Sequence, residues 1–301
     1  MAKTASCRCC GAINFTSAMV KTPMPNRGNR NAYMCEKCAT ENESYHTTNR
    51  RIDGTAKKNA VMVGIEFETS FTDEIARNQM FEFGFIPTHD GSLESDGNGS
   101  RYGWDENTCE YVSGIWQGLN KASKFAVTAE KLISDGHMKI NDSCGTHFHV
   151  SIDSMKDGNG CKIYMDYIRN YYIDIFAPLT VAMKRNPEAT CTLFGRYFNG
   201  CYASSIDVYS SVGDRYNFIN VTNDSNIEFR LNRFQTAKQY QNLMKMEVEM
   251  VKAIITNFCE HYNDTPTDSR RYPDMDSYRK HKAAVTANKL VKLFEKFASN
   301  M

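Results

Sequence analysis

Two glutamates separated by a single residue, Glu66 and Glu68, stand in an apolar run that begins at Ala60. In an extended chain successive side chains point to opposite faces, so the two carboxylates share one face while Ile65 and Phe67 share the other. Carboxylates at this spacing repel each other unless a cation or a base neutralises them. The pair therefore indicates a site that holds a cation or a basic side chain.

The same alternation recurs in two stretches that lie far away along the chain. His147 and His149 alternate with apolar residues in one of them, and Glu228 and Arg230 do so in the other. An ordinary half-buried strand alternates apolar residues with bland polar ones, whereas these strands carry side chains that bind metals and phosphates. We therefore predict one sheet with an apolar back and an ionisable front.

The donor atoms of these side chains decide which chemistry they support. Carboxylate oxygens are hard ligands suited to Mg2+ or Mn2+, and Glu110, in a predicted short strand over residues 109–113, adds one more. The guanidinium of Arg230 would either neutralise the carboxylates or hold a phosphate. Metal-binding carboxylates and arginines on one concave sheet are what phosphoryl transfer requires. In a single strand an ion pair is the simpler interpretation, but three such strands together favour a site.

His147 and His149 have several interpretations. Both could bind zinc or iron in a site of two histidines and one carboxylate, or one could contact a metal or substrate while the other is structural. None of the remaining histidines lies a short way downstream to complete a three-histidine set, which disfavours an oxygenase. The sequence has no P-loop and no glycine-rich dinucleotide motif, so a different scaffold would hold ATP.

Two Cys-x2-Cys pairs, Cys7 with Cys10 and Cys35 with Cys38, lie near the start of the chain. Four thiolates satisfy tetrahedral zinc. Because so short a segment has little core of its own, metal binding would supply most of its folding energy. The alternative is a fortuitous or oxidised cluster. Whether Cys9 competes with Cys7 or Cys10 stays open.

Charge is nearly balanced over the 301 residues, with 36 Lys and Arg against 35 Asp and Glu, so net charge indicates no partner. Residues 1–60 are basic, with ten Lys and Arg against four Asp and Glu. We predict a zinc-ribbon-like module over residues 1–45, a basic polar linker over 46–59 and a catalytic domain over 60–301. The linker would contact a nucleic acid or an acidic protein, or serve only as a solvated tether.

The cysteines outside the two pairs are scattered singly, and the total of eleven is odd, which is unlike a disulfide framework. Residues 1–15 lack the apolar region of a signal peptide, and no apolar run approaches membrane-spanning length. We therefore expect a cytoplasmic protein with no membrane contact.

Helices are predicted around these strands. One of them begins at Thr72-Asp73-Glu74 in the manner of an N-cap with acidic residues in the first turn, and Gly84 ends it. The other predicted elements are a helix over 116–134, a helix over 161–176 that is checked by Pro178 or continues to 184, a functional loop or lid over 186–214, a hairpin between 215–221 and 226–232, and helices over 237–262 and 279–299.

Five short motifs, in one order along the chain, resemble the amidoligase family. That family belongs to the carboxylate–amine ligases, whose catalytic domain is similar to that of glutamine synthetase. The resemblance covers roughly residues 61–260. The motifs occupy residues 63–68, 89–93, 110–113, 144–150 and 215–230.

The resemblance implies an α+β fold, in which a curved antiparallel β-sheet with flanking helices surrounds a funnel. In this chain the small zinc-binding module, which core members of the family do not need, precedes that domain. ATP and two or three Mg2+ or Mn2+ ions would lie between the carboxylates. A substrate carboxylate would attack the γ-phosphate of ATP, and an amine would take the acyl phosphate to give an amide, ADP and phosphate.

The resemblance also assigns roles to the matching positions of this chain. They are Glu66, Glu68, Glu110 and Glu228 as metal ligands; His147 or His149 as a contact to metal or phosphate; Arg230 as the group that stabilises the transferring phosphoryl; Arg215 as a contact to phosphate or to the substrate carboxylate; Asn220 and Asp90 as orienting residues; and Arg196 as a weaker candidate for substrate binding. The carboxylate and the amine, free or part of a peptide or another macromolecule, stay unspecified.

Two other functions remain open. One is a metal-dependent hydrolase or oxygenase that uses His147, His149 and a carboxylate. The other is a zinc-ribbon adaptor for nucleic acid or protein on an inactive enzyme body, which predicts binding that weakens steeply with salt. In the ligase interpretation, the zinc module would deliver a macromolecular partner.

Overall fold

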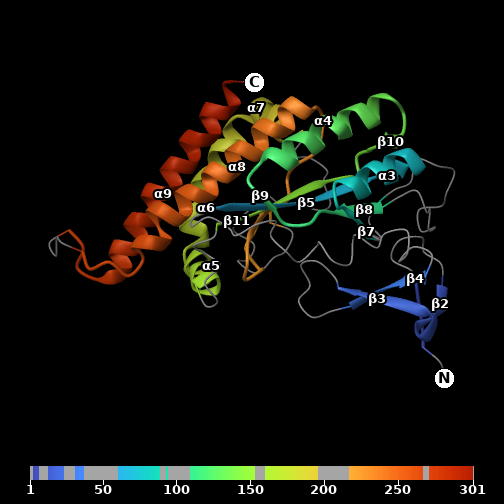
Figure 1. The fold of residues 1–301 in the computed structure, drawn as a ribbon. Coiled ribbons are helices and arrows are strands. Elements are labelled where there is room, and N and C mark those ends of the chain that lie inside the picture. Colours follow the sequence, from blue (N-terminus) through green and yellow to red (C-terminus); the bar gives the residue numbers. More distant parts are fainter. Residues whose placement is uncertain are drawn as a thin grey trace. The chain divides into compact units, whose positions relative to one another are not determined.

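The computed structural model describes residues 3–6, 13–23, 31–36, 60–88, 93, 109–152, 160–195, 217–266 and 271–300. Within these ranges the chain is a mixed α+β protein with an antiparallel sheet and flanking helices, which confirms the predicted class (Figure 1). The likeness to a glutamine synthetase domain stays a prediction. No helix of the described part is both long enough and apolar enough to cross a membrane.

The N-terminal residues form two short hairpins. Their only buried apolar residues among those described are Met19 and Met34, so this part has little core of its own. Cys35 is the last residue of its strand, whereas Cys7, Cys9, Cys10 and Cys38 lie outside the described residues, so the zinc module stays a prediction. The elements are β1 (Thr4–Ser6) paired with β2 (Ile13–Phe15), η1 (Thr16–Ala18), and β3 (Met19–Pro23) paired with β4 (Asn31–Cys35).

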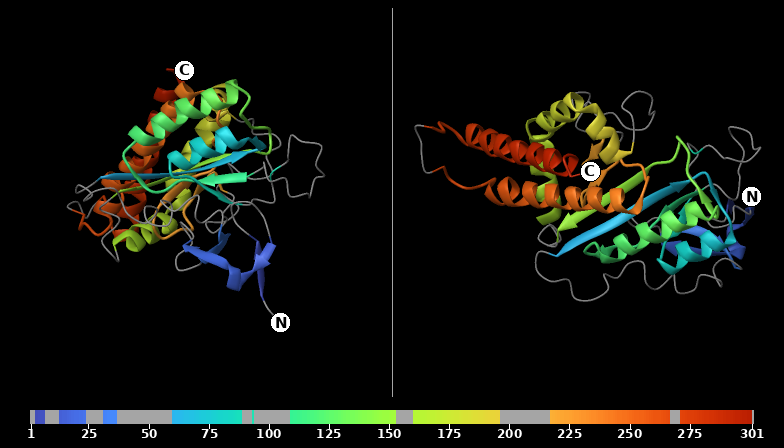
Figure 2. Two further views of the ribbon diagram at one scale, coloured as in Figure 1. Left: turned by 45° about the vertical axis from the view of Figure 1, so that its right-hand side comes forward. Right: turned by 90° about the horizontal axis from the view of Figure 1, so that it is seen from above.

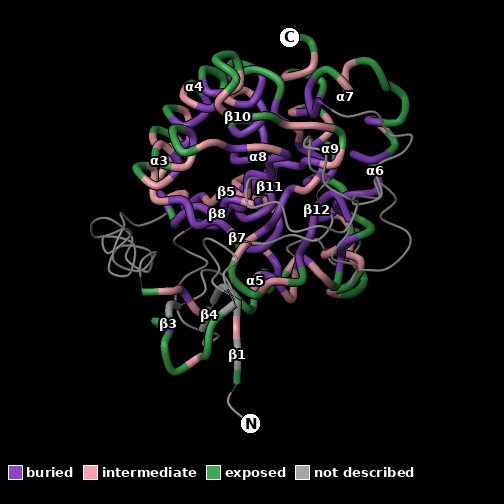
Figure 3. Tube along the Cα trace, turned by 90° about the vertical axis from the view of Figure 1, so that its right-hand side faces the viewer, coloured by how far each residue is buried: buried purple, intermediate pink, exposed green. Residues whose placement is uncertain are grey.

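A seven-stranded sheet carries the three stretches that alternate apolar and ionisable residues. Its strands are β5 (Val61–Thr69), β7 (Ile86–Thr88), β8 (Cys109–Val112), β9 (Trp116–Gln117), β11 (Thr146–Ile152), β12 (Ile219–Asn220) and β13 (Ile227–Phe229). Their order is β12-β13-β11-β5-β8-β7, with β9 paired to β5. The predicted adjacency is confirmed, since β13, β11 and β5 are consecutive neighbours. Their traces are largely buried (Figure 3).

Residues 64–146 belong, with residues 1–55, to one compact unit of the chain. Here α3 (Glu74–Glu82) and α4 (Asn120–Ser134) lie on the same side of β5 and β8 (Figure 1). The ring of Phe125 on α4 meets that of Phe67 edge to face, with centroids 5.2 Å apart. This contact covers the apolar face of β5, so Glu66 and Glu68 project from the opposite face. A separate pair, β6 (Phe71–Thr72) with β10 (Met138–Lys139), completes the unit.

Two helix starts in this unit can be compared with the sequence. The helix start predicted at residues 72–74 is confirmed, and the structure identifies its N-cap as Asp73, whose carboxylate accepts a hydrogen bond from the Ala76 N–H at 3.0 Å. The predicted helix over 116–134 begins later than expected. Trp116 belongs to β9, and Gly118 then adopts a φ of 70°, a left-handed conformation that separates the strand from α4.

Residues 147–301, with 56–63, form a second compact unit that is mainly helical. In this unit α9 packs against α6 and α8, and Figure 2 shows α8 and α9 running side by side. The helices are α5 (Gly160–Asn170), α6 (Tyr172–Arg185), α7 (Pro187–Phe194), α8 (Ala237–Asn257), η3 (Cys259–His261) and α9 (Met275–Ala298). The predicted division of the chain at residues 45 and 59 is not tested by these units.

Two helix predictions in this unit are wrong in detail. The helix predicted over 161–176, checked by Pro178 or continuing to 184, is divided at Tyr171 into α5 and α6. Pro178 lies inside α6, which continues to Arg185, so the second alternative holds for this end. Pro178 and Asp174 are exposed, so water can satisfy the Asp174 carbonyl that the proline leaves without a donor. The segment over 186–214, predicted to be a functional loop or lid, contains α7, which begins at Pro187, ends at Phe194 and is followed by Gly195 in the left-handed conformation. Its remaining residues lie outside the described part.

Candidate functional site

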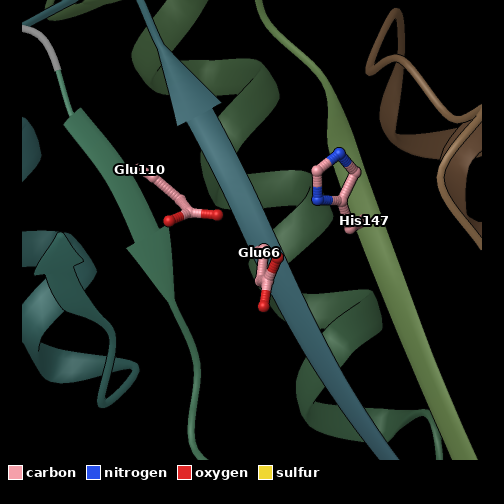
Figure 4. A group of neighbouring side chains, drawn as sticks. All are labelled: Glu66, Glu110 and His147. Carbon is pink, nitrogen blue, oxygen red and sulfur yellow. The ribbon is translucent and has the colours of Figure 1, made fainter. Parts of the chain in front are cut away.

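Two groups of potential metal ligands form on the sheet, and Glu66 belongs to both. One group is Glu66, Glu110 and His147, and the other is Glu66, His149 and Glu228. Within each group the ligand atoms all lie within 4.8 Å of one another. Figure 4 shows Glu110 and His147 on the strands that flank β5, with Glu66 near them on β5 itself.

Strand register explains why residues so distant in sequence meet. Glu68 pairs with Glu110 across β5 and β8, and His149 pairs with Glu228 across β11 and β13. Side chains directly opposite each other on antiparallel strands share a face and lie roughly 5 Å apart. The period of two then brings Glu66 and His147 to the same face as their neighbours.

Burial differs across the two groups. His147, Glu228 and His149 are buried, with 4%, 6% and 8% of their surface exposed, whereas Glu66 and Glu110 are half-buried. A buried carboxylate is costly unless it is paired, hydrogen-bonded or bound to a metal. Glu66 and Glu110 are therefore the more solvent-accessible ligands, and the buried Glu228 is the carboxylate that most needs a partner.

Several donors hold the carboxylate of Glu228. The Asn220 Nδ2 donates to Glu228 Oε2 at 2.7 Å, and Arg230 Nη1 donates to Oε1. His147 Nδ1 lies 3.6 Å from the same Oε1 atom. The backbone N–H of Arg230 also donates to the Phe218 carbonyl at 2.8 Å, so the strand itself is anchored. The orienting role in catalysis that the resemblance implies for Asn220 stays a prediction.

The hydrogen bond of His149 indicates which ring nitrogen can bind a metal. Its Nδ1 lies 3.1 Å from Asn226 Oδ1, the carbonyl oxygen of a side chain that can only accept at this atom. In the neutral ring this contact requires the proton on Nδ1, which leaves the lone pair of Nε2 for a metal. Nothing in the sequence pattern singled out Asn226.

Glu68 lies outside both groups, although the sequence placed it among the metal ligands. Its carboxylate accepts a hydrogen bond from the Gly145 N–H. Its own N–H donates to the Gly145 carbonyl at 3.1 Å. This reciprocal contact fixes the residues just before β11 beside β5, so Glu68 helps to place His147.

Glu110 is oriented by a residue that the sequence pattern did not indicate. The hydroxyl of Thr88, on β7, donates to Glu110 Oε2 at 2.7 Å. Hydrogen bonds of this kind depend on tertiary contacts and leave no periodic signal. Three predicted residues cannot be placed, because Asp90, Arg196 and Arg215 lie outside the described residues.

The donor atoms test whether the predicted ions fit. Each group offers two carboxylates and one imidazole. Mg2+ prefers oxygen ligands and keeps several waters, whereas Mn2+ and other first-row ions also accept imidazole nitrogen. The groups therefore fit a divalent ion, and of the two predicted ions they fit Mn2+ better than Mg2+. His147 and His149 belong to different groups, which disfavours a site with both histidines on one ion.

Comparisons with family models and with curated proteins find no match to this chain. The amidoligase assignment accordingly stays an expectation from the five sequence motifs. The ligand groups stand independently of it, because they follow from strand order, register and side-chain distances.

Proposed function

We propose that the chain is a divalent-metal-dependent enzyme and that its reaction is the ATP-dependent joining of a carboxylate to an amine. The observation that carries the metal part is the shared ligand, since Glu66 lies within 4.8 Å of ligand atoms in both groups. A carboxylate between two ion positions is typical of sites that act on phosphate oxygens. The ligase part is supported by the five sequence motifs and their order along the chain.

The proposed roles follow from the positions of the side chains. Glu66 and Glu110 with His147 would hold one ion, and Glu66 with His149 and Glu228 would hold the other. Bound ions would neutralise the negative charge of the ATP phosphates. Arg230 has five N–H donors, so one side chain can hold Glu228 and contact a phosphate oxygen.

The first substrate would be a carboxylate, activated as an acyl phosphate, and the second an amine. His147 and Arg230 both lie at the Glu228 carboxylate, so that positive charge or N–H donors are concentrated where a transferred phosphoryl group would need them. In the same proposal, Cys7, Cys10, Cys35 and Cys38 hold a structural zinc, and the N-terminal module brings a macromolecular substrate to the catalytic domain.

A second candidate is a two-metal hydrolase, which the imidazole in each group favours. The two functions differ in their use of nucleotide. A ligase forms one ADP and one phosphate for each amide, and only when both substrates are present. A hydrolase cleaves an ester, amide or phosphate bond without consuming ATP.

The experiment is an assay for ADP formation with Mn2+ or Mg2+ over a panel of carboxylates and amines. We expect ADP that depends on a carboxylate and an amine and disappears in Glu66→Gln. The control is Glu82→Gln, an exposed glutamate on α3, which should behave as wild type. Metal-dependent hydrolysis by the wild type without any ADP would instead support the second candidate.

A further inference from the structure

Arg169, on α5, makes a set of contacts to one distant turn. Its Nε donates to the Val221 carbonyl at 2.7 Å, and its Nη2 donates to the Thr222 carbonyl at 3.2 Å and to Asp224 Oδ1 at 2.7 Å. Its Nη1 donates to Asp166 Oδ1 at 2.9 Å. Nη1 of the guanidinium thus bonds to a residue of its own helix, and Nε and Nη2 bond to the turn between β12 and β13.

The turn that Arg169 binds is hydrogen-bonded to the side chain of Asn220. The N–H and the hydroxyl of Thr222 both donate to Asn220 Oδ1, at 2.9 Å and 2.8 Å. A backbone N–H can only donate, so this end of the Asn220 amide must be the oxygen. The Nδ2 end is then directed at Glu228 Oε2, 2.7 Å away.

We infer that Arg169 is a positioning residue for the metal site: it fixes the turn, the turn orients Asn220, and Asn220 orients the Glu228 carboxylate. The inference rests on the proposed function in one respect, since it takes Glu228 to be a metal ligand. Each link is a hydrogen bond between described residues, and the whole chain of contacts runs from α5 to β13.

The contacts require an arginine rather than any cation. The planar guanidinium reaches two carbonyls and two carboxylates in different directions, and a lysine ammonium lacks this fixed fork of donors. Groups that orient metal ligands typically change metal affinity by about 10–100-fold when they are removed. Arg169 acts through two intermediates, so we expect an effect near the lower end of that range.

The test measures Mn2+ binding to the full-length, zinc-loaded chain by electron paramagnetic resonance. We expect Arg169→Gln to weaken Mn2+ binding about tenfold and to change the line shape of the bound ion at saturation. Arg169→Lys should not restore either property. Arg185→Gln, an exposed arginine on α6, is the matched control and should equal wild type.

Asn220→Ala tests whether Arg169 affects the ion through Asn220. If both residues act through the same carboxylate, the double variant should be no weaker than Asn220→Ala alone. Thr222→Val removes one donor to Asn220 without touching Arg169, and it should weaken binding in the same direction even if Arg169→Gln does not fold.

The outcomes separate this inference from the proposed function. Wild type that binds no Mn2+ would overturn the metal site and the role of Arg169 with it. Wild-type binding together with unchanged affinity and line shape in a folded Arg169→Gln would overturn the positioning role alone. If Arg169→Gln does not fold, unchanged binding in Thr222→Val overturns it.

Discussion

Glu247 on α8 should make the stability of the folded chain fall as pH rises. Its side chain is fully buried, and burial raises its pKa well above the ordinary value of 4.5 despite a hydrogen bond from Asn232. The Asn232 Nδ2 donates to Glu247 Oε2 at 3.1 Å. Burial also raises the pKa of the Tyr240 phenol on α8, and the charge of the nearby Glu247 carboxylate adds to that rise.

The sign follows from comparing the two states. The folded chain keeps the Glu247 proton at pH values where the unfolded chain has released it. The contribution of the protonated Glu247 to the unfolding free energy is therefore fully present below pH 4.5, and it is lost as the pH rises toward the raised pKa of the folded state. Within that window each pH unit costs about 1.4 kcal/mol of unfolding free energy.

The perturbation is Glu247→Gln, which keeps an oxygen for Asn232 but cannot ionise. Urea unfolding, followed by circular dichroism at several pH values above 4.5, should show a slope in wild type that is absent in the variant. Glu249→Gln, an exposed neighbour that pairs with Lys252, is the control and should retain the wild-type slope. Parallel pH dependence in wild type and Glu247→Gln would refute this reasoning.

Two further predictions concern local structure. Partial burial raises the pKa of Asp73, but hydrogen bonds from Ala76 and His137 outweigh it and lower that pKa below 3.8. Asp73→Ala should therefore lower the unfolding free energy by about 1 kcal/mol at neutral pH. In urea unfolding this loss should shrink as the pH falls toward the lowered pKa, and a loss that does not change with pH would contradict the prediction. At Gly195, where φ is 75°, an added Cβ would lie 2.5 Å from the Arg233 carbonyl oxygen. Gly195→Ala should cost about 1–3 kcal/mol in thermal or urea unfolding, and a cost near zero would disprove the close approach.

The arrangement of the sheet was predictable because it depends on periodicity. Apolar and ionisable residues alternate along β5, β11 and β13 with a period of two, so the ionisable side chains must share one face once the strands pair. The strands could be expected to pair because their apolar faces need a common cover, which Phe125 of α4 supplies in part. Glu66, His147 and Glu228 follow directly from that pattern.

The parts that could not be predicted depend on single tertiary contacts. Glu68 has the same type and spacing as Glu66, yet its carboxylate accepts a backbone N–H from Gly145. Arg169 and Thr88 orient ligands from elements that show no chemical pattern in the sequence. The protonation of Glu247 depends on complete burial, which periodicity alone does not give.

The most direct test of the shared-ligand site is the number of Mn2+ ions bound by wild type and by variants of single ligands. We expect two ions in wild type, one for each of the two described ligand groups, with Glu66 as the ligand that both groups share. Glu110→Gln should lose one ion, Glu228→Gln should lose the other, and each should keep the remaining one.

Glu66→Gln, which removes the ligand common to both groups, should lose both ions. Isothermal titration calorimetry together with electron paramagnetic resonance gives the stoichiometry on the full chain. We expect that, of the three variants, only Glu66→Gln loses both ions. A Glu66→Gln variant that still binds two Mn2+ ions with wild-type affinity would contradict the site at its centre.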